Sequence, residues 1–188
     1  DRVKENLFWK FVDGIAYWNK GIAGIYEKII GKEYIKEEEK FDFLNVKNIL
    51  HIGCGSYPIS ALTLARNNNR KIVTIDRDAE SIKKARKIIS KKKLGKNIKA
   101  NIGCGEEYSL DKFDLIIVSG CSVPRYNVVD HIFKNSKPST KIIIRKEVKE
   151  ERWFKDLLEK YDRIKVLDKM INNPYPLCKW NSVFLIKN

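Results

Sequence analysis

Two short segments of the chain carry residue types that could bind a nucleotide-like cofactor. The turn Gly53-Cys54-Gly55 directly follows an apolar run that ends at Ile52. Glycine lets the backbone bend sharply and approach a ligand that a Cβ would exclude. Asp76 ends the next β-branched run, where an acid can accept hydrogen bonds from ribose hydroxyls. The pair predicts a cofactor crevice, against the alternative of a tight turn and an exposed Asp that caps the next helix.

The cysteines could also do chemistry, because three of the four follow apolar runs where strands are expected to end. These three are Cys54, Cys104 and Cys121. Cys121 is a candidate covalent nucleophile, since Arg125 or a helix N-terminus could favour its thiolate form. A soft metal site is a second option, with the candidate ligands Cys54, Cys121, His51 and Cys178. The third option is small apolar filling of tight turns, and because the spacing matches no standard zinc pattern we expect reduced thiols and no metal.

From Val46 onward the sequence alternates short apolar runs with charged stretches of helical length. The runs are Asn48–Ile52, Lys71–Ile75, Ile98–Ile102, Asp114–Ser119 and Lys141–Arg145. The helical stretches are Ser60–Asn67, Ala79–Lys93, Tyr126–Asn135 and Glu150–Tyr161. Strands buried on both faces that alternate with helices indicate a doubly wound parallel sheet. The last two runs, Arg163–Leu167 and Val183–Lys187, have no helix between them and predict a closing antiparallel pair.

The first 45 residues have a different texture. Their apolar side chains recur at helical spacing, as in Phe8, Phe11, Ile15, Trp18, Ile22 and Ile25. This pattern predicts two amphipathic helices, broken near Gly21 or Gly24, with the second ending at Gly31 and a short charged helix over Lys32–Lys40. The expected organisation is therefore an N-terminal helical cap over residues 1–45 and a cofactor-binding domain over residues 46–188.

Three motifs of this second part stand in a familiar order. They are Leu50-His51-Ile52-Gly53-Cys54-Gly55, Thr74-Ile75-Asp76-Arg77-Asp78 and Phe113-Asp114-Leu115-Ile116-Ile117-Val118. With them the chain resembles, over residues 46–188, the class I S-adenosylmethionine-dependent methyltransferase superfamily. The resemblance implies an α/β fold, with a Rossmann-like, doubly wound, mostly parallel seven-stranded sheet that ends in an antiparallel hairpin. It also implies S-adenosyl-L-methionine as the cofactor.

The same resemblance implies which residues hold the cofactor. Gly53 and Gly55 would approach its methionine part, and Asp76 would hold its ribose. His51 stands where many members carry an acid, and it could contact the cofactor or be a buried structural histidine. Cys104 stands where the family often has an Asp near the adenine. The candidate cofactor contacts are His51, Gly53, Cys54, Gly55, Asp76, Arg77, Cys104 and Ser119.

Methyl transfer is the activity that the resemblance implies. Transfer from a sulfonium needs proximity and in-line alignment, with a base only if the acceptor carries a proton. The candidate catalytic residues lie in or just after the loop that follows the fourth run, and they are Cys121, Arg125 and Tyr126. Ser122 is a further acceptor contact in this loop, and Tyr175 and Trp180 could wall the acceptor pocket.

Three other functions stay open. The loop Gly53–Ser60 is similar to that of nicotianamine synthase-like members, which transfer the aminocarboxypropyl arm of the cofactor rather than its methyl group. The segment expected after Arg145 in those enzymes is missing, so the loop supports kinship and leaves that reaction as an alternative. An RNA methyltransferase and a non-catalytic cofactor-binding protein are the remaining alternatives.

The length and the net charge of the chain limit the kinds of acceptor and binding partner that we expect. The chain has 188 residues, and 38 Lys+Arg against 24 Asp+Glu give a formal net charge of +14. Little length remains for a separate recognition domain, so we expect a small-molecule acceptor. Nucleic acid is the alternative, although the densest basic run, Lys83–Lys93, has no aromatic residues for base stacking. The absence of a membrane-spanning run and of a signal-peptide pattern favours a cytoplasmic protein, and the oligomeric state stays open.

Overall fold

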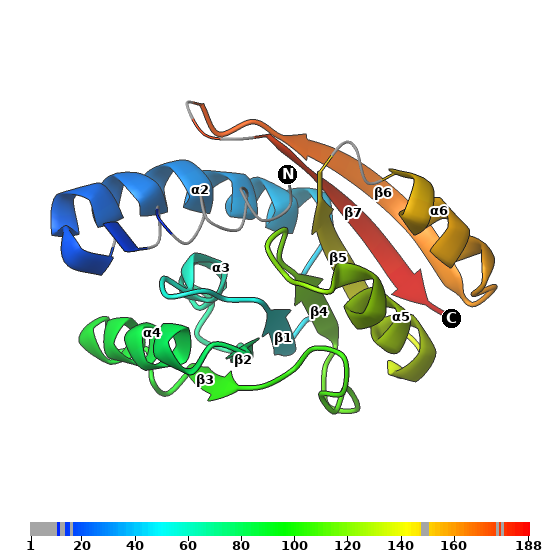
Figure 1. The fold of residues 1–188 in the computed structure, drawn as a ribbon, viewed down its shortest axis with the longest axis horizontal. Coiled ribbons are helices and arrows are strands. Elements are labelled where there is room, and N and C mark those ends of the chain that lie inside the picture. The colour runs from blue at the N-terminus through cyan, green and yellow to red at the C-terminus, as the bar shows by residue number, and fades with distance from the viewer. Residues whose placement is uncertain (1–10, 12–13, 16, 148–150, 176, 178) are drawn as a thin grey trace.

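A central seven-stranded sheet organises the computed structural model, in the strand order β3-β2-β1-β4-β5-β7-β6 (Figure 1). The structure describes residues 11–188 except 12–13, 16, 148–150, 176 and 178. The strands are β1 Asn48–Ile52, β2 Lys71–Asp76, β3 Ile98–Ile102, β4 Leu115–Val118, β5 Lys141–Lys146, β6 Ile164–Asn172 and β7 Trp180–Lys187. The first five are parallel, and β7 runs antiparallel to both β5 and β6. The predicted doubly wound sheet with its closing antiparallel pair is confirmed.

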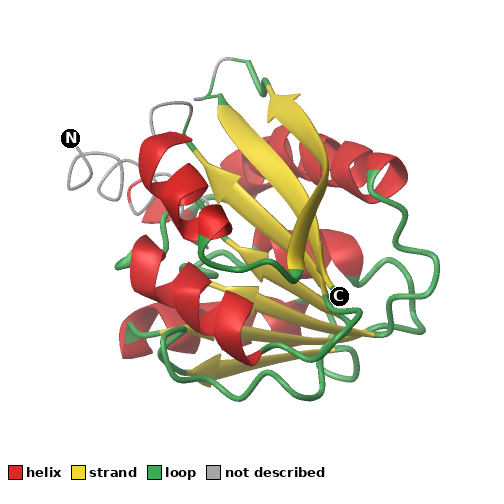
Figure 2. Ribbon diagram, turned by 90° about the vertical axis from the view of Figure 1, so that its right-hand side faces the viewer, coloured by secondary structure: helices red, strands yellow, loops and turns green. Residues whose placement is uncertain are grey.

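Helices cover both faces of the sheet (Figure 2). The helices α2 Lys20–Lys40, α3 Ile59–Leu64 and α4 Ala79–Lys91 lie on one face, and α5 Arg125–Asn135 and α6 Glu151–Glu159 lie on the other. Successive strand residues point to opposite faces, so Ile49 belongs to the core under α2–α4 while Leu50 belongs to the core under α5 and α6. This two-sided burial explains why the central strands read as unbroken apolar runs.

The N-terminal cap differs from the sequence expectation. The helical break lies at Asn19, whose side chain accepts hydrogen bonds from the backbone N–H groups of Gly21 (2.9 Å) and Ile22 (3.2 Å). From there α2 runs unbroken to Lys40, so Gly31 does not end it and the charged stretch is its second half. A Cβ at Gly31 would lie 3.2 Å from Oγ1 of Thr63 in α3. Close packing of the two helices thus outweighs the weak helix propensity of glycine, about 1 kcal/mol. Phe8 lies outside the described residues.

The closing strands are longer than predicted, because β6 continues past Leu167 to Asn172 and β7 begins at Trp180. β6 is one edge of the sheet, with buried ends, exposed residues over 165–167, alternation of partly buried and exposed residues over 168–171, and a register irregularity between Val166 and Asp168. An edge strand that is exposed on one face does not need a continuous apolar run. The part of β6 after Leu167 therefore has no apolar run that would predict a strand.

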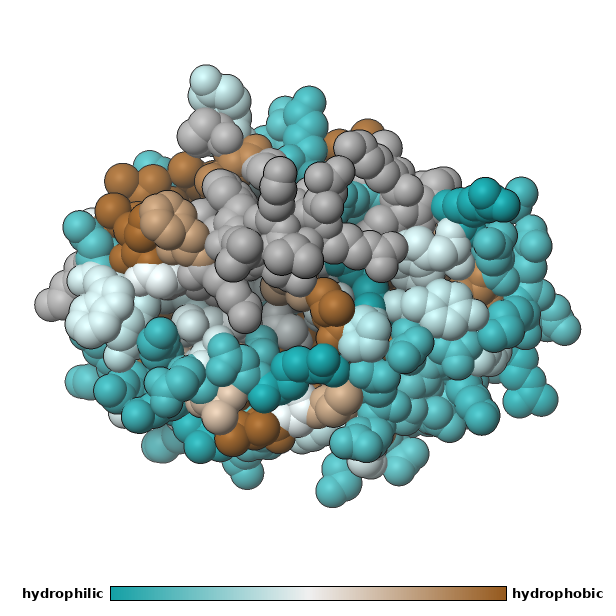
Figure 3. All heavy atoms as spheres, viewed as in Figure 1, coloured by the Kyte–Doolittle hydropathy of each residue, from teal (hydrophilic) through white to brown (hydrophobic). Residues whose placement is uncertain are grey.

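The surface of the cap helix is partly apolar. Figure 3 shows apolar residues gathered over the first half of α2, at the upper left, where Ile22 and Ile25 are 40% and 61% exposed. Within the described part of the chain, no helix is long and apolar enough to cross a membrane.

Candidate functional site

The turn after β1 has the backbone geometry that its two glycines allow. Gly53 has φ +79° and Gly55 has φ +63°, both in the left-handed region that disfavours a side chain. A Cβ at Gly53 would also lie only 2.3 Å from Oγ of Ser122, which donates a hydrogen bond to the carbonyl of Ile52 (3.0 Å). The strand end and the loop after β4 can therefore meet only because position 53 has no side chain.

Asp76, at the end of β2, braces this turn from the neighbouring strand. One carboxylate oxygen accepts the backbone N–H of Gly55 (2.9 Å), and the other accepts the backbone N–H of Asp78 (3.0 Å). Each carboxylate oxygen has two lone pairs, so both keep acceptor capacity toward a ligand. Asp76 is not the residue that caps the next helix. The N-cap of α4 is Asp78, whose side chain accepts a hydrogen bond from the backbone N–H of Glu80.

A crevice of about 400 Å³ opens at this end of the sheet. Glycines, Asp76 and its neighbours, and the loop after β4 form its walls, in full Ile52, Gly53, Gly55, Ser56, Ile75, Asp76, Arg77, Asp78, Ser81, Gly103, Gly105, Cys121, Ser122, Val123 and Val128. The volume is in the range of small-molecule sites, and the position is the carboxyl end of the strands at the β1/β4 switch point. The predicted crevice beside Gly53 and Asp76 is thus present.

A second, smaller cavity of about 80 Å³ lies on the α2 side of the same loop, and we call it the inner chamber. Its lining residues are Tyr26, Tyr34, His51, Gly53, Cys54, Tyr57, Ile59, Ser60, Ser119, Gly120, Cys121, Arg145 and Trp180. Gly53 and Cys121 line both cavities, so these two residues form the partition between the crevice and the chamber.

Arg145, at the carboxyl end of β5, forms a buried ion pair beside the chamber. Its Nε and Nη2 donate to the carboxylate of Glu37 on α2, at 3.1 Å and 2.7 Å to Oε2, while Nη1 donates to Oγ of Ser60 (2.7 Å). The side chains of Arg145 and Glu37 are 4% and 1% exposed. The guanidinium also lies 3.7 Å from the ring centroid of Tyr34.

Three neutral donors from the tail hairpin share the carboxylate of Glu37. They are the hydroxyl of Ser182, the indole N–H of Trp180 and the amide of Asn172. The network therefore ties the cap helix to β5, β6 and β7, and a buried carboxylate is stable there because it is paired and hydrogen-bonded.

His51 is a buried, neutral side chain in the chamber floor. Its Nδ1 lies 3.1 Å from Oγ1 of Thr74, and its Nε2 lies 2.7 Å from Oγ of Ser119. Because the Thr74 hydroxyl donates to the backbone carbonyl of His51 (3.4 Å), we assign the ring proton to Nδ1 and a donated Ser119 proton to Nε2. Burial, with the nearby charge of Arg145, lowers the pKa of His51 to about 3.

Arg77 and Cys104 meet at the far wall of the crevice. The guanidinium of Arg77 donates to Oε1 of Glu106 (3.1 Å) and approaches Sγ of Cys104 (3.5 Å). Arg77 lines the crevice, whereas around Cys104 it is the flanking Gly103 and Gly105 that line it. Hydrogen bonds and charge from Cys104 and Glu106 outweigh slight burial and raise the pKa of Arg77.

The three candidate catalytic residues separate in space. Cys121 lies at the partition, with Sγ 3.8 Å from the carbonyl of Gly53. Arg125 begins α5 and lines neither cavity. Tyr126 is 41% exposed and faces α6, where its ring lies 6.1 Å from that of Trp153 and its hydroxyl accepts from Lys160 (3.3 Å).

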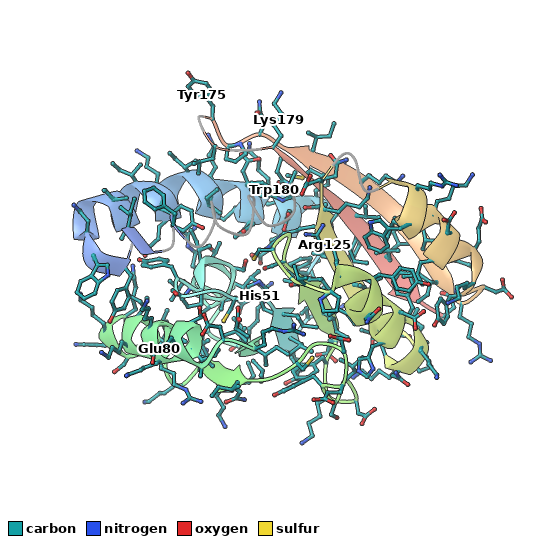
Figure 4. All side chains as sticks on the ribbon, in the orientation of Figure 1. His51, Glu80, Arg125, Tyr175, Lys179 and Trp180 are labelled. Atoms are coloured by element: carbon teal, nitrogen blue, oxygen red, sulfur yellow. The ribbon has the colours of Figure 1, made fainter. Side chains whose placement is uncertain are left out.

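The two aromatic residues predicted to wall the acceptor pocket, Trp180 and Tyr175, also lie in different environments. Figure 4 shows Trp180 beside α2, at the start of β7, and Tyr175 pointing away from the body of the protein. Trp180 is a chamber wall, whereas Tyr175 is 86% exposed.

The cysteines and the basic run that the sequence singled out can be placed in the structure. Cys54, Cys104 and Cys121 are thiols, and Cys178 lies outside the described residues. No group of three or more His, Cys, Asp or Glu side chains in the described segments could hold a metal ion. The basic run after Asp76 contributes to a separate open groove beside α4 and β3, with the cationic residues Arg86, Lys93, Lys96 and Lys99, and this groove shares no lining residue with the crevice.

Residues 44–182 match the family described as "Methyltransferase domain". The chain belongs to this methyltransferase family. Its cofactor is S-adenosylmethionine, as the resemblance implied. No curated protein sequence matches the chain.

Solved structures agree on the fold of this methyltransferase at low sequence identity. A mutant of MtNAS in complex with S-adenosylmethionine is 16% identical with a TM-score of 0.66, and the match covers 83% of this chain and 62% of that one. The mitomycin 7-O-methyltransferase MmcR is 14% identical with a TM-score of 0.67, covering 94% and 60%. A putative sarcosine dimethylglycine methyltransferase from Galdieria sulphuraria is 11% identical with a TM-score of 0.67, covering 85% of each chain. This chain thus spans less than two thirds of the length of the first two.

The crevice of this methyltransferase suits the cofactor by its own geometry. A Cβ at Gly103 would lie 2.9 Å from the ring of Tyr108, and one at Gly105 would lie 2.7 Å from Ile52. Gly103 and Gly105 of the loop after β3, like Gly53 of the loop after β1, thus keep the backbone where no side chain could be added. The open acceptor positions of Asp76 fit ribose hydroxyls.

Sequence reasoning missed most of the inner chamber. Arg145 carried a weak signal, because a charged residue that ends a buried strand is placed at the ligand edge of the sheet. Glu37 carried none, since it stands within the charged stretch Lys32–Lys40, which reads as a solvated helix face. Tyr26 and Tyr34 likewise read as ordinary core residues of an amphipathic helix.

Proposed function

We propose that this methyltransferase transfers the methyl group of S-adenosylmethionine to a small-molecule acceptor whose reacting end lies in the inner chamber. The observation that carries the proposal is the shared partition of Gly53 and Cys121 between the crevice and the chamber. When bound, the cofactor supplies an electrophilic methyl group. Methyl transfer needs proximity and in-line alignment, so the acceptor has to reach the methyl group past the edge of this partition, with no protein atom between the two.

In this proposal, different residues bind the cofactor and the acceptor. The Gly53–Gly55 turn and Asp76 hold the cofactor in the crevice. Cys121 contacts both ligands at the partition, while His51 and Ser119 form a fixed polar floor beneath the acceptor. Tyr26 and Tyr34 of α2 roof the chamber and exclude water from the reacting groups.

Asp76→Ala tests the cofactor half of this proposal. The variant removes the acceptor from ribose and the brace from Gly55, so we expect S-adenosylmethionine affinity to fall at least about tenfold, measured by calorimetry. Asp162→Ala, at an exposed carboxylate, is the matched control and should keep full affinity. Unchanged affinity in Asp76→Ala would show that the cofactor does not bind in this crevice.

Product analysis tests the reaction itself. Methyl transfer leaves S-adenosylhomocysteine, whereas aminocarboxypropyl transfer leaves methylthioadenosine, and mass spectrometry separates the two. The RNA alternative predicts RNA binding with a steep loss of affinity as salt rises. Absence of RNA affinity at low salt would rule out the RNA alternative.

A further inference from the structure

The inner chamber has an unusual charge balance for an acceptor site. Among the described residues that line it, Arg145 carries the one formal charge and no carboxylate is present. Glu37 approaches the guanidinium from outside the lining, and its charge is also shared by the neutral donors Ser182, Trp180 and Asn172. Arg145 and Glu37 form a neutral pair, but the guanidinium is the end of the pair that faces the chamber, so the local field favours an anion over an ammonium.

One edge of the guanidinium is placed to meet a ligand. Nε and Nη2 of Arg145 are directed at Glu37, whereas Nη1 donates to Ser60, which also lines the chamber. Nη1 carries two N–H groups, and Ser60 is its one hydrogen-bond partner among the described residues, so a second donor is available there. Charge-assisted hydrogen bonds from Arg to an anionic oxygen or sulfur are among the strong ones.

Among the described lining residues, neither the imidazole nor the phenols whose pKa is shifted are suited to remove a proton from an acceptor near neutral pH. His51 is the one imidazole in its lining, and it is buried, hydrogen-bonded at both nitrogens and of low pKa. Burial raises the pKa values of Tyr34 and Tyr57, so both phenols stay neutral. An acceptor that arrives already deprotonated needs no base.

The size and walls limit the acceptor further. The chamber volume of about 80 Å³ is roughly half that of a ~150 Å³ cavity that holds benzene, so only the reacting end of a small molecule fits. Two edge-to-face aromatic pairs make its walls, Tyr26 with Tyr57 (6.0 Å) and Tyr34 with Trp180 (5.9 Å). These walls suit a short apolar stem next to the charged group.

We infer that the inner chamber is a subsite for the reacting end of a small anionic acceptor, a thiolate or carboxylate on a short apolar stem, which Arg145 attracts. The inference rests on the proposed methyl transfer and names its acceptor class. The acceptor anion supplies the electron pair for the new bond to the methyl carbon, while the bond from that carbon to the sulfonium sulfur breaks and its pair stays on that sulfur. The negative and positive charges cancel, and no proton moves.

Three probes with three carbon atoms each test the charge preference. Propionate, propionamide and propylammonium are titrated into the full chain saturated with S-adenosylhomocysteine, and binding is followed by NMR. We expect propionate to bind at least about tenfold more tightly than propylammonium, with propionamide between them. In turnover, propionate should be converted to its methyl ester, whereas 1-propylamine, which is an ammonium near neutral pH, should not be methylated.

Gly120→Leu locates the binding in the chamber. Gly120 lines it, and a Cβ there would lie 3.8 Å from the carbonyl oxygen of Arg145, its nearest neighbour atom among the described residues, so a side chain is tolerated. Propionate affinity should fall about tenfold or more in this variant. Gly95→Leu, where a Cβ meets nothing within 4 Å, is the matched control and should bind propionate normally.

Two results would overturn the inference. Propylammonium binding as tightly as propionate would remove the charge argument. Propionate binding that S-adenosylhomocysteine abolishes would show that the carboxylate of the cofactor itself fills the chamber. The proposed function fails separately, if the chain does not bind S-adenosylmethionine or never forms S-adenosylhomocysteine with any acceptor.

Discussion

At the scale of single residues, His51 shows how one side chain can look functional in sequence and be held structurally. It stands two positions before the first glycine of the cofactor turn, yet both ring nitrogens are engaged by Thr74 and Ser119. His51 lines the inner chamber, so it could shape the acceptor site that we propose there, and a contact between His51 and the cofactor stays a prediction. Because the fold lowers the pKa of the neutral His51 ring, the free energy of unfolding should depend on pH.

His51→Asn should reveal that dependence. The folded pKa of about 3 is below the unfolded value of about 6.5, so the unfolded state binds more protons and stability falls as pH drops below 6.5. Between pH 7 and pH 5 the natural protein should lose about 2 kcal/mol more unfolding free energy than the variant. Urea unfolding at both pH values measures this, and His131 is common to both proteins. Equal losses would mean that His51 is not held neutral by the fold.

At the scale of elements, the contact between α2 and α3 decides the geometry of the cap. Gly31 and Thr63 mark a close approach of the two helices, and α3 follows the Gly53–Gly55 turn. The cap helix is therefore positioned by the same short helix that follows the cofactor loop.

Gly31→Leu should separate the two helices. A side chain at this position meets Thr63 at 3.2 Å, so we expect a loss of about 1–3 kcal/mol in unfolding free energy. Gly24→Leu on the same helix has open space around its Cβ and should be neutral or gain up to about 1 kcal/mol from helix propensity. Thermal unfolding of the two variants side by side measures the difference, and equal effects would contradict the close-packing argument.

At the scale of the whole molecule, one buried ion pair connects the N-terminal cap to the C-terminal half of the sheet. Glu37 and Arg145 are 108 positions apart in sequence and meet beneath the tail hairpin. The cap and the methyltransferase domain therefore share one polar network, although they differ in sequence texture.

A double-mutant cycle tests this connection. Glu37→Gln and Arg145→Met should each cost about 3–5 kcal/mol, because each leaves a buried partner without its counter-charge. The double variant removes both charges, so its cost should be smaller than the sum of the single costs by at least about 2 kcal/mol. Urea unfolding provides the three values, and additive costs would show that the pair is not coupled.

The sequence by itself determined the parallel sheet, most of the helix positions and the cofactor turn. These features depend on local properties: apolar runs for buried strands, glycines where φ is positive, and an acid at the end of the second strand. The bounds of β1 and β3 agree with the prediction for that reason.

Only the tertiary structure decided the course of the cap helix, the inner chamber and the surroundings of the loop after β4. α2 passes through Gly31 because α3 packs there, and Tyr126 turns toward α6 instead of the crevice. Glu37 is buried only because Arg145 and the hairpin donors reach it from distant parts of the chain. Burial of a charge depends on its partners in space, and no local pattern in the sequence encodes them.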